Sequence, residues 1–367
     1  MHPQLSAVIV NYNTWPDTRR LVRQLCQAGL AGDPSSEIVV VDNAYLPHPD
    51  ETDWPAADRV RLLRSSQNTG FAGGVNRGCR AARGRFLLVM NPDLEVRPGF
   101  LADLHAAVER MQAAPLQYRG ARRPVGMVGF QLLNPDRSRQ HCAGFFPQVW
   151  WTIAGQLFAR DRRKYRPLYN LRLAPVDWVT GACFLLDRRL FDQLGGMDER
   201  FFLYYEEVDF CRRAQAAGWQ VAYDPAVRLV HYRPLQSRNV GLKLRMVTRH
   251  SQLYYFRKHL PRWQFALLAV ATAAEAQARS WSARLAGAGR DRCADWLRIR
   301  SMACRMLTGP ILPVGEYFDE PRSRPAPTTR HAPPDTHPGD VLLSPHPHHF
   351  TAAQPTPSMH VAASQHG

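Results

Sequence analysis

The chain has 367 residues, of which 45% are hydrophobic and 10% aromatic. This composition excludes a disordered or fibrous protein and is sufficient for a large buried core. Lys and Arg total 47 against 31 Asp and Glu, a net charge of +16, which favours an anionic partner such as a phosphorylated metabolite, an acidic lipid or a nucleic acid. Because no nucleic-acid recognition motif accompanies the charge, we expect no nucleic-acid partner.

The seven cysteines are scattered, odd in number and without a CxxC pair. This pattern suggests neither a disulfide framework nor a zinc site, and it favours a reducing cytoplasm. The N-terminal residues lack the charged leader and cleavage site of a signal peptide, and the longest later apolar run, 265–274, is too short to cross a bilayer. We therefore expect a cytoplasmic protein without a transmembrane segment.

The first 135 residues alternate short β-branched runs with longer helical patterns, which predicts an α/β fold with a mixed, mostly parallel sheet flanked by helices. The expected strands are 5–11, 37–41, 60–63, 85–90, 125–133, 176–186 and 220–232. The expected helices are 16–28, 72–82, 100–111 and 202–217. Residues 140–170 break the pattern and are expected to be irregular.

Polar clusters follow three of these strands, namely Asn11-Tyr12-Asn13, Asp42-Asn43 and Asn91-Pro92-Asp93. Each cluster alone is better explained as a turn that caps the next helix. Ligands of open α/β sheets bind at the carboxyl ends of the strands, however, so three clusters at one edge indicate a binding site. Carboxylates there accept hydrogen bonds from ribose hydroxyls or a base.

The segment NTGFAGGVNRG, residues 68–78, opens a predicted helix with several glycines, which let a backbone approach a ligand closely. It is neither a Walker loop nor a GxGxxG sequence. A ligand-binding turn and a simple helix start both remain open as explanations.

Asp93 is the residue of the third cluster that can hold Mg²⁺ or Mn²⁺, with phosphate groups of a ligand completing the coordination. His231, in the run RLVHY, is either a structural histidine or a second ligand of that cation. A cation at this place would stabilise the negative charge that develops on a leaving phosphate group.

The segment GGMDERFFLYYEEVDFCRRAQAAGW, residues 195–219, carries five carboxylates around aromatic residues. Carboxylates in the first turn of a helix are also favoured by the helix dipole, so a structural role is an alternative. Asp209 can pair with Arg212 or Arg213 one turn further on, which leaves Glu207 as the better general base. Glu206 stays ambiguous, and Asp198 is expected to shape the loop before the helix.

These residues, in this order, resemble the family 2 glycosyltransferases with the GT-A fold, in particular the rhamnosyltransferase-like branch. The matching segments are VIVNYNT (8–14), IVVVDNA (38–44), NTGFAGGVNRG (68–78), LLVMNPD (87–93), VTGACFLLDRR (179–189), residues 195–219 and VRLVH (227–231). The resemblance implies a Rossmann-like catalytic domain over residues 1–240. It also implies inverting transfer from dTDP-rhamnose or a UDP-sugar to a saccharide or lipid-linked saccharide, in cell-surface polysaccharide synthesis.

The resemblance assigns roles to individual residues. It implies that Glu207 is the catalytic base and that Asp93 and His231 form the metal site for Mg²⁺ or Mn²⁺. The implied donor-nucleotide residues are Asn11, Asn13, Asp42, Asn68, Gly70, Asn76 and Asn91. The implied acceptor side comprises Gly181, Ala182 and Glu206.

Two departures from the family pattern stand out. The usual Asp-x-Asp motif is here Asn91-Pro92-Asp93, and the usual Glu-Asp pair is Glu206-Glu207. The first departure leaves the metal site with fewer carboxylates, and the second gives the base a longer side chain. The alternative function is a catalytically inactive protein that binds nucleotide sugars or polysaccharide.

A basic helical extension is expected over residues 241–312. Residues 241–305 contain thirteen Lys or Arg and three Asp or Glu, with Trp263, Phe265, Trp281 and Trp296 among them. This extension either rests on the anionic inner face of the cytoplasmic membrane or packs on the catalytic core with a solvated basic face. Residues 313–367, rich in Pro and His, are expected to form a disordered tail.

Overall fold

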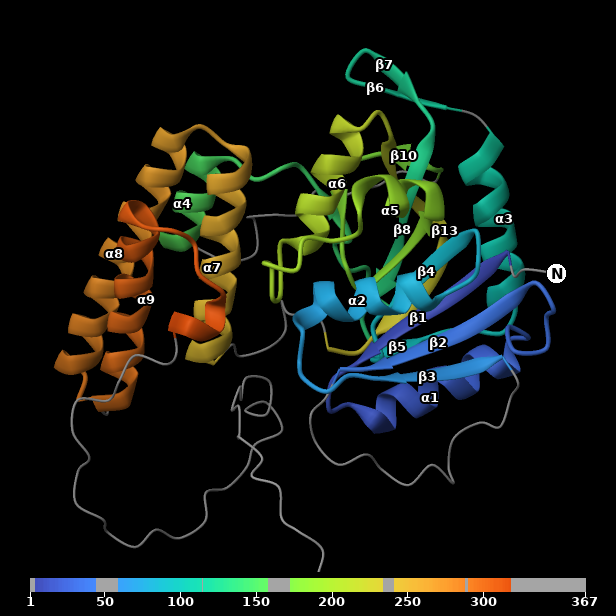
Figure 1. The fold of residues 1–367 in the computed structure, drawn as a ribbon, viewed down its shortest axis with the longest axis horizontal. Helices are drawn as coiled ribbons and strands as arrows, with labels where there is room; N and C mark the ends of the chain where they lie inside the picture. The colour runs from blue at the N-terminus through green and yellow to red at the C-terminus, as the bar shows by residue number, and fades with distance from the viewer. Residues whose placement is uncertain are drawn as a thin grey trace, which may run out of the picture.

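The computed structural model describes residues 4–43, 59–113, 115–157, 172–233, 241–287 and 290–317 of the chain. A sheet covered by helices lies beside a group of helices that comes mostly from the C-terminal part of the chain, drawn in gold to orange in Figure 1. The residues predicted to bind ligands are positioned by the sheet and by the helices on either side of it.

Nine strands form the main sheet in the order β10–β13–β8–β12–β4–β1–β2–β3, with β5 paired to β13. They are β1 (Leu5–Asn11), β2 (Ser36–Asp42), β3 (Val60–Arg64), β4 (Phe86–Met90), β5 (Leu94–Glu95), β8 (Val125–Leu133), β10 (Ala174–Pro175), β12 (Cys183–Asp187) and β13 (Gln220–His231). β5, β10 and β12 run antiparallel to their neighbours, and the other pairings are parallel. Six of the nine strands therefore share one direction, which confirms the mixed, mostly parallel sheet.

The strands at the centre of the sheet are buried on both faces. Every residue of β1, β2 and β4 is buried, in keeping with their nearly continuous apolar sequences. Helices α1 (Trp15–Gln27) and α2 (Gly70–Ala81) cover opposite faces, because the chain moves in opposite directions across the sheet at these two right-handed crossovers.

Two glycines bring α2 close to β1. A Cβ atom at Gly74 would lie 2.5 Å from a Val10 methyl, and one at Gly78 would lie 2.3 Å from a Val8 methyl. Both separations are too short for a real contact, so the glycines at these positions are required by helix–sheet packing rather than by a ligand.

The other helices of the α/β part are α3 (Phe100–Ala113), α5 (Arg188–Leu194) and α6 (Glu206–Ala216). Two small sheets pair β6 (Leu116–Tyr118) with β7 (Ala121–Arg123) and β9 (Ala143–Gly144) with β11 (Trp178–Val179). β11 and α6 lie against each other, so the chain before β12 meets the helix that follows it in sequence.

The C-terminal helices are α7 (Leu242–His259), α8 (Arg262–Leu285) and α9 (Arg290–Thr308), followed by a 3₁₀ helix, η4 (Val314–Tyr317). α8 and α9 pack along each other, and helix α4 (Val149–Leu157) joins them from the middle of the chain (Figure 1). Gln156 of α4 donates hydrogen bonds to Gln252 of α7 and Thr272 of α8, at 3.0 and 3.2 Å. The helical group thus includes a segment from within the first 240 residues.

Three sequence expectations need correction. Residues 140–170 contain α4, because the apolar sequence VWWTIAGQL buries one side against α8; residues 158–171 lie outside the described part of the chain. The strand expected at 176–186 is divided into β11 and β12 by a turn at Gly181. The helix expected from residue 202 begins at Glu206, since Tyr204 and Tyr205 have φ values of +67° and +71°, outside the helical region.

The remaining expectations concern the cysteines, the membrane and the tail. All seven cysteines are free thiols. Among the described residues, no helix is long and apolar enough to cross a membrane. The ordered chain continues beyond residue 312, because Val314 and Tyr317 are buried; residues 318–367 of the predicted tail lie outside the described residues.

Candidate active site

The carboxyl ends of β1 and β2 place Asn11 beside Asp42. The two residues face each other in the strand register, both are fully buried, and Asn11 Nδ2 donates to Asp42 Oδ1 at 3.1 Å. Asn11 Oδ1 accepts hydrogen bonds from the hydroxyls of Thr14 and Thr18. Asn11 therefore orients the Asp42 carboxylate and joins it to the start of α1.

The turn before α2 is held by Asn43. Its amide nitrogen donates to the Gly70 carbonyl at 2.8 Å and to Asn68 Oδ1 at 3.2 Å, while its amide oxygen accepts from Thr69. Asn68 Oδ1 also accepts from the Gly70 amide at 2.9 Å. A side-chain hydrogen bond joins Asn68 to Tyr12; burial raises the pKa of that tyrosine, and the bond partly offsets the effect. The polar clusters after β1 and β2 therefore meet at one turn.

Gly70 lies against the loop that precedes α6. Its φ is +73°, and a Cβ atom there would lie 2.2 Å from the carbonyl oxygen of Phe202. The next amide, of Phe71, donates to the same carbonyl at 2.8 Å. The first N–H groups of α2 are thus bound within the protein, which favours the helix-start explanation of the glycine-rich segment.

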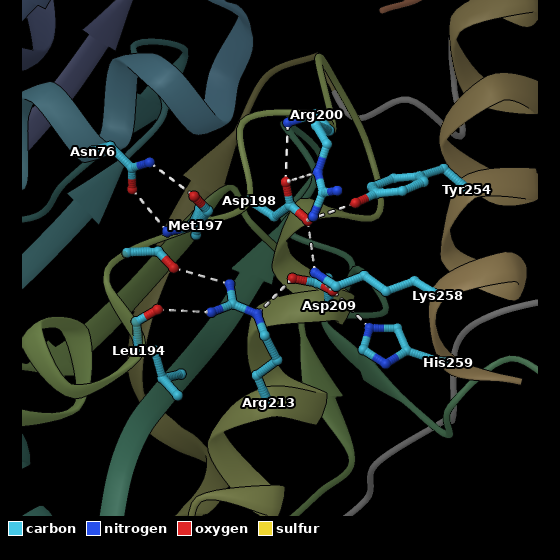
Figure 2. Close-up of polar contacts among 11 residues, drawn as sticks. Asn76, Leu194, Met197, Asp198, Arg200, Asp209, Arg213, Tyr254, Lys258 and His259 are labelled. Carbon is cyan, nitrogen blue, oxygen red and sulfur yellow. Dashed lines mark hydrogen bonds and ion pairs between the residues drawn. The ribbon is translucent and has the colours of Figure 1, made fainter. Parts of the chain in front are cut away.

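Asn76 joins α2 to the same loop at a second point, shown in Figure 2. Its amide nitrogen donates to the Met197 carbonyl and its amide oxygen accepts from the Met197 amide, both at 2.8 Å. The nitrogen also donates to Glu199 at 2.8 Å. Asn76 is 1% exposed, so its side chain connects α2 to the loop; its predicted contact with the donor stays a prediction.

Asn91, directly after β4, lies next to Gly181 and Ala182 of the predicted acceptor side, because β4 pairs with β12. The Asn91 amide donates to the Ala182 carbonyl at 2.8 Å. A Cβ atom at Gly181 would lie 3.6 Å from Glu207 Cβ and 3.3 Å from the ring of Phe71. The turn that divides β11 from β12 therefore lies in contact with the proposed base.

Glu206 and Glu207 are the first two residues of α6 and are 3% and 6% exposed. They follow Tyr205, whose left-handed backbone ends the loop and turns the chain into the helix. The Tyr205 hydroxyl accepts a hydrogen bond from Gln252 of α7 at 2.9 Å. The start of α6 is therefore fixed from the side of the C-terminal helices.

Helix α7 also holds the loop and the first turn of α6 through charged groups, as Figure 2 shows. Lys258 Nζ lies 2.7 Å from Asp198 Oδ2 and 2.6 Å from Asp209 Oδ1. Tyr254 and Arg200 also donate to Asp198, at 2.8 and 2.9 Å. Burial raises the pKa of Asp198, but these hydrogen bonds outweigh it and leave the pKa well below its usual value.

Asp209 has no exposed surface and is surrounded by cations. Arg213 Nε donates to it at 2.8 Å, which resolves the predicted pairing in favour of Arg213, and His259 Nε2 lies 2.6 Å away. Burial raises its pKa, whereas His259, Arg213 and Lys258 together leave the pKa lowered. Asp209 is therefore a structural anion, as the sequence suggested.

Asp93 and His231 come together where β5 pairs with β13. His231 Nε2 lies 3.5 Å from Asp93 Oδ1, the Arg233 amide donates to Asp93 Oδ2 at 3.2 Å, and the Tyr232 amide donates to the Asp93 backbone carbonyl at 3.0 Å. On the other side of the ring, His231 Nδ1 lies 3.0 Å from Gln140 Oε1. The structure thus brings the two predicted metal ligands together and adds Gln140, which sequence reasoning missed.

Gln140 decides which ring nitrogen of His231 carries the proton. Gln140 Nε2 donates to Asn134 Oδ1 and to the His231 carbonyl, each at 2.9 Å, so Oε1 is the atom that faces Nδ1. Nδ1 is then the donor and Nε2 presents a lone pair toward Asp93. A nitrogen and an oxygen 3.5 Å apart fit two ligands of one divalent cation, and Arg233 Nε, 3.8 Å from Asp93 Oδ2, adds a positive charge beside the same carboxylate.

The pair supplies two ligand atoms and no more. Within the described residues, no group of three or more His, Cys, Asp or Glu side chains is placed to hold a metal ion. The remaining ligands of a cation would have to come from a bound phosphate or from water.

For two predicted donor residues, Asn13 and Asn91, no side-chain contact is described; Asn13 lies in the loop after β1 with φ of +52°, and Asn91 is bound through its backbone amide. The structure adds Asn43, Gln140 and Lys258 to the predicted set. Asn43 stood within a cluster noted from the sequence, whereas no sequence signal pointed to the other two.

Comparison with known proteins decides the family. Residues 6–195 match the model of the family described as Glycosyl transferase family 2, which is more than half of the chain. The chain belongs to glycosyl transferase family 2.

This glycosyltransferase is similar to two curated relatives. It is 30% identical over 249 residues to the N-acetylglucosaminyl-diphospho-decaprenol L-rhamnosyltransferase of Mycobacterium tuberculosis, covering 62% of this chain and 76% of the relative. It is 27% identical over 239 residues to the low-salt glycan biosynthesis hexosyltransferase Agl10 of Haloferax volcanii, covering 64% and 69%. Among solved structures it is similar to GalNAc-T7 with UDP, GalNAc and Mn²⁺, at 17% identity and a TM-score of 0.47, covering 70% of this chain and 50% of that one.

The predicted family, its rhamnosyltransferase-like branch and the enzyme class are therefore confirmed. The protein is a glycosyltransferase of glycan or polysaccharide synthesis. The family model ends at residue 195, before Glu207, so the proposed base and the helix that supports it lie beyond the matched segment.

Proposed function

We propose that this glycosyltransferase moves a sugar, with inversion, from dTDP-rhamnose or a UDP-sugar to a saccharide or lipid-linked saccharide at the cytoplasmic face of the membrane. The relative from Mycobacterium tuberculosis supports this proposal by its name, which specifies an L-rhamnosyl donor group and a decaprenol-linked diphosphate acceptor. The role in cell-surface polysaccharide synthesis follows the same relationship.

One observation carries the assignment of the site. Glu207 lies beside Gly181, and the adjacent Ala182 carbonyl binds the Asn91 amide in the loop that leads to Asp93. The proposed base and the loop that leads to the proposed diphosphate position therefore both contact the turn at Gly181-Ala182. A direct displacement needs the base and the leaving group to bind at one site, on opposite sides of the anomeric carbon.

The chain's residues perform distinct steps in this mechanism. Glu207 takes the proton of the acceptor hydroxyl as its oxygen bonds to the anomeric carbon, while the bond from that carbon to the donor diphosphate breaks. Asp42 binds the nucleoside at the end of β2, and Asn11 orients its carboxylate. Asp93 and His231 would hold Mg²⁺ or Mn²⁺, which supplies positive charge to the departing diphosphate when bound.

Replacing Glu207 with Gln tests the proposal. We expect transfer to fall by at least about 100-fold while donor binding, measured by calorimetry, stays unchanged. Glu206→Gln is the matched variant on the same helical turn, and we expect it to raise KM for the acceptor while kcat falls by less than about tenfold. Unchanged transfer by Glu207→Gln would remove the assignment of the base.

The donor is identified by hydrolysis of thymidine, uridine and guanosine diphosphate sugars, with and without Mn²⁺. Turnover of one donor class by the wild-type protein is expected. Binding of a donor with no hydrolysis or transfer under any of these conditions would instead support the alternative, a nucleotide-sugar or polysaccharide binding protein.

A further inference from the structure

The outer side of α8 is apolar along its whole length. Trp263, Val270, Trp281 and Leu285 are 56%, 57%, 59% and 90% exposed. At about 100° per residue, the first three lie within about 20° of one another around the helix axis, and Leu285 lies within about 40° of Trp263. These four residues, here called the α8 stripe, extend over about 33 Å.

The opposite side of α8 is also apolar. Phe265, Leu268 and Ala269 are buried against the other helices, so they cannot contact a membrane; the same holds for Trp296 of α9. A helix on the surface of a water-soluble protein normally turns a polar side outward. A helix that is apolar on both sides indicates that the outer side has a partner of its own.

The charge on the exposed part of α8 has one sign. Its charged residues are Arg262, Glu275, Arg279 and Arg284. The single acid, Glu275, is buried and binds Arg249 at 2.6 Å and Arg279 at 2.9 Å. On α8 itself, Arg284 and Arg262 lie about 60° and 100° around the axis from Trp263, so they flank the α8 stripe, while Arg279 is paired with Glu275 on the buried side.

This combination matches the surface of an anionic bilayer. Trp side chains prefer the boundary between headgroups and acyl chains, and the α8 stripe has one near each end. Arginines beside them would meet the phosphates of anionic lipids. Because no helix in the described part of the chain can cross a membrane, α8 would lie in the plane of the surface.

We propose that the α8 stripe is the surface by which this protein binds an anionic membrane, with Trp263 and Trp281 inserted among the headgroups. A second copy of the chain is a poorer partner, because a symmetric contact would bring the arginines of one α8 toward those of the other. The proposal deepens the proposed function, since a lipid-linked acceptor would be presented at that surface.

Vesicle sedimentation of the full chain tests the proposal. The wild-type protein is expected to sediment with phosphatidylcholine vesicles that contain phosphatidylglycerol, and to sediment less with pure phosphatidylcholine or at high salt. The double variant Trp263→Ala/Trp281→Ala should lose at least about tenfold in binding, because two large apolar side chains no longer leave water. Alanine favours helix, so the variant should fold, which circular dichroism checks.

The matched control removes two exposed tryptophans from another helix. Trp150 and Trp151 of α4 are 63% and 70% exposed, and α4 contacts α8 through Thr272, nine residues after Trp263 and so about half a turn around from the stripe. Trp150→Ala/Trp151→Ala should therefore retain vesicle binding. An equal loss in both double variants would overturn the assignment to α8.

Two further measurements separate the other outcomes. A dimer in sedimentation velocity that the α8 double variant dissociates, with no vesicle binding by the wild-type protein, would show that a second copy covers the stripe and would overturn the proposal. Transfer to a water-soluble acceptor should be the same in the variant and the wild type. If the wild-type protein transfers sugar but does not bind vesicles, the proposed function is retained and the proposal for the α8 stripe is overturned.

Discussion

Lys258 Nζ lies 2.6 Å from Asp209 Oδ1, so a side chain of α7 reaches the first turn of the helix on which Glu207 stands. The same nitrogen binds Asp198 in the loop before that helix. Ser251 and Gln252 of α7 add hydrogen bonds to Leu203 and Tyr205 in the same loop, each at 2.9 Å. The helical extension is therefore part of the support of the active site, in addition to any role at a membrane.

The first prediction concerns this support. Lys258→Met keeps the aliphatic chain but leaves Asp198 and Asp209 with one cation fewer, so the turn that carries Glu207 should shift. We expect kcat to fall by up to about 100-fold, the usual consequence of a misplaced catalytic group, while KM for the donor changes by less than about twofold.

The control is Lys243→Met, which removes an exposed lysine from the first turn of the same helix. It should leave both constants near the wild-type values. Steady-state kinetics well below the melting temperature of each variant makes the comparison, and a fall in kcat that is equal in the two variants would argue against a positioning role for Lys258.

The second prediction compares two glycines with left-handed backbone. Gly70 (φ +73°) would place a Cβ atom 2.2 Å from the Phe202 carbonyl, whereas Gly99 (φ +83°) has no atom within 4 Å of that position. Gly99→Ala should cost only the conformational strain, about 1–2 kcal/mol of unfolding free energy. Gly70→Ala should cost at least about 3 kcal/mol, because backbone atoms must move as well.

Urea unfolding of both variants measures these costs. Where Gly70→Ala still folds, donor affinity should also fall, because Asn68 and Asn43 are bound to this residue. Equal free energies for the two variants would show that α2 does not depend on its contact with the loop before α6.

The third prediction follows from the hydrogen bond between Gln140 and His231. Gln140→Leu removes the acceptor that holds the Nδ1 proton, so Nε2 should become a poorer metal ligand. The Mn²⁺ concentration for half-maximal activity is expected to rise by about 10-fold to 100-fold. Gln140→Glu keeps an acceptor oxygen, so the Mn²⁺ concentration for half-maximal activity should rise less in this variant. An unchanged Mn²⁺ dependence in Gln140→Leu would show that Gln140 does not support the cation site.

The fourth prediction is a loss of stability in mild acid. His250 is buried in α7 with Nε2 2.9 Å from the Leu312 carbonyl, and burial lowers its pKa to about 4. The unfolded chain, with a histidine pKa of about 6.5, binds the proton first, so stability present at neutral pH is lost as the pH falls below about 6.5. At pH 5 this group alone should cost about 2 kcal/mol of unfolding free energy.

Unfolding in urea at pH 7 and pH 5 measures the effect. His250→Gln keeps a polar side chain that does not titrate in this range, and the part of the pH dependence due to His250 should disappear in it. A difference between the two pH values that is the same in the variant and the wild type would assign the effect to other groups.

The sequence alone determined the buried strands of the sheet and the edge at which ligands bind. Residues 7–10, 38–41 and 86–90 are apolar without interruption and lie in the buried strands, and polar residues directly after them mark the ligand edge because parallel strands end together. The carboxylates at the start of α6 were also found from the sequence, because they are clustered within one short segment. Their spacing along one helix also separated Asp209, which pairs with Arg213 one turn on, from Glu207.

Only the tertiary structure decided which distant residues support these groups. Asn76 binds Met197 across 121 positions of sequence and Gln140 binds His231 across 91, and neither contact has a periodic or compositional signal. The basic character of residues 241–305 likewise did not distinguish Lys258, whose charge is used inside the protein, from the arginines of α8 that face outward. That distinction depends on how helices pack against the sheet, and packing is set by the whole chain rather than by any one segment of it.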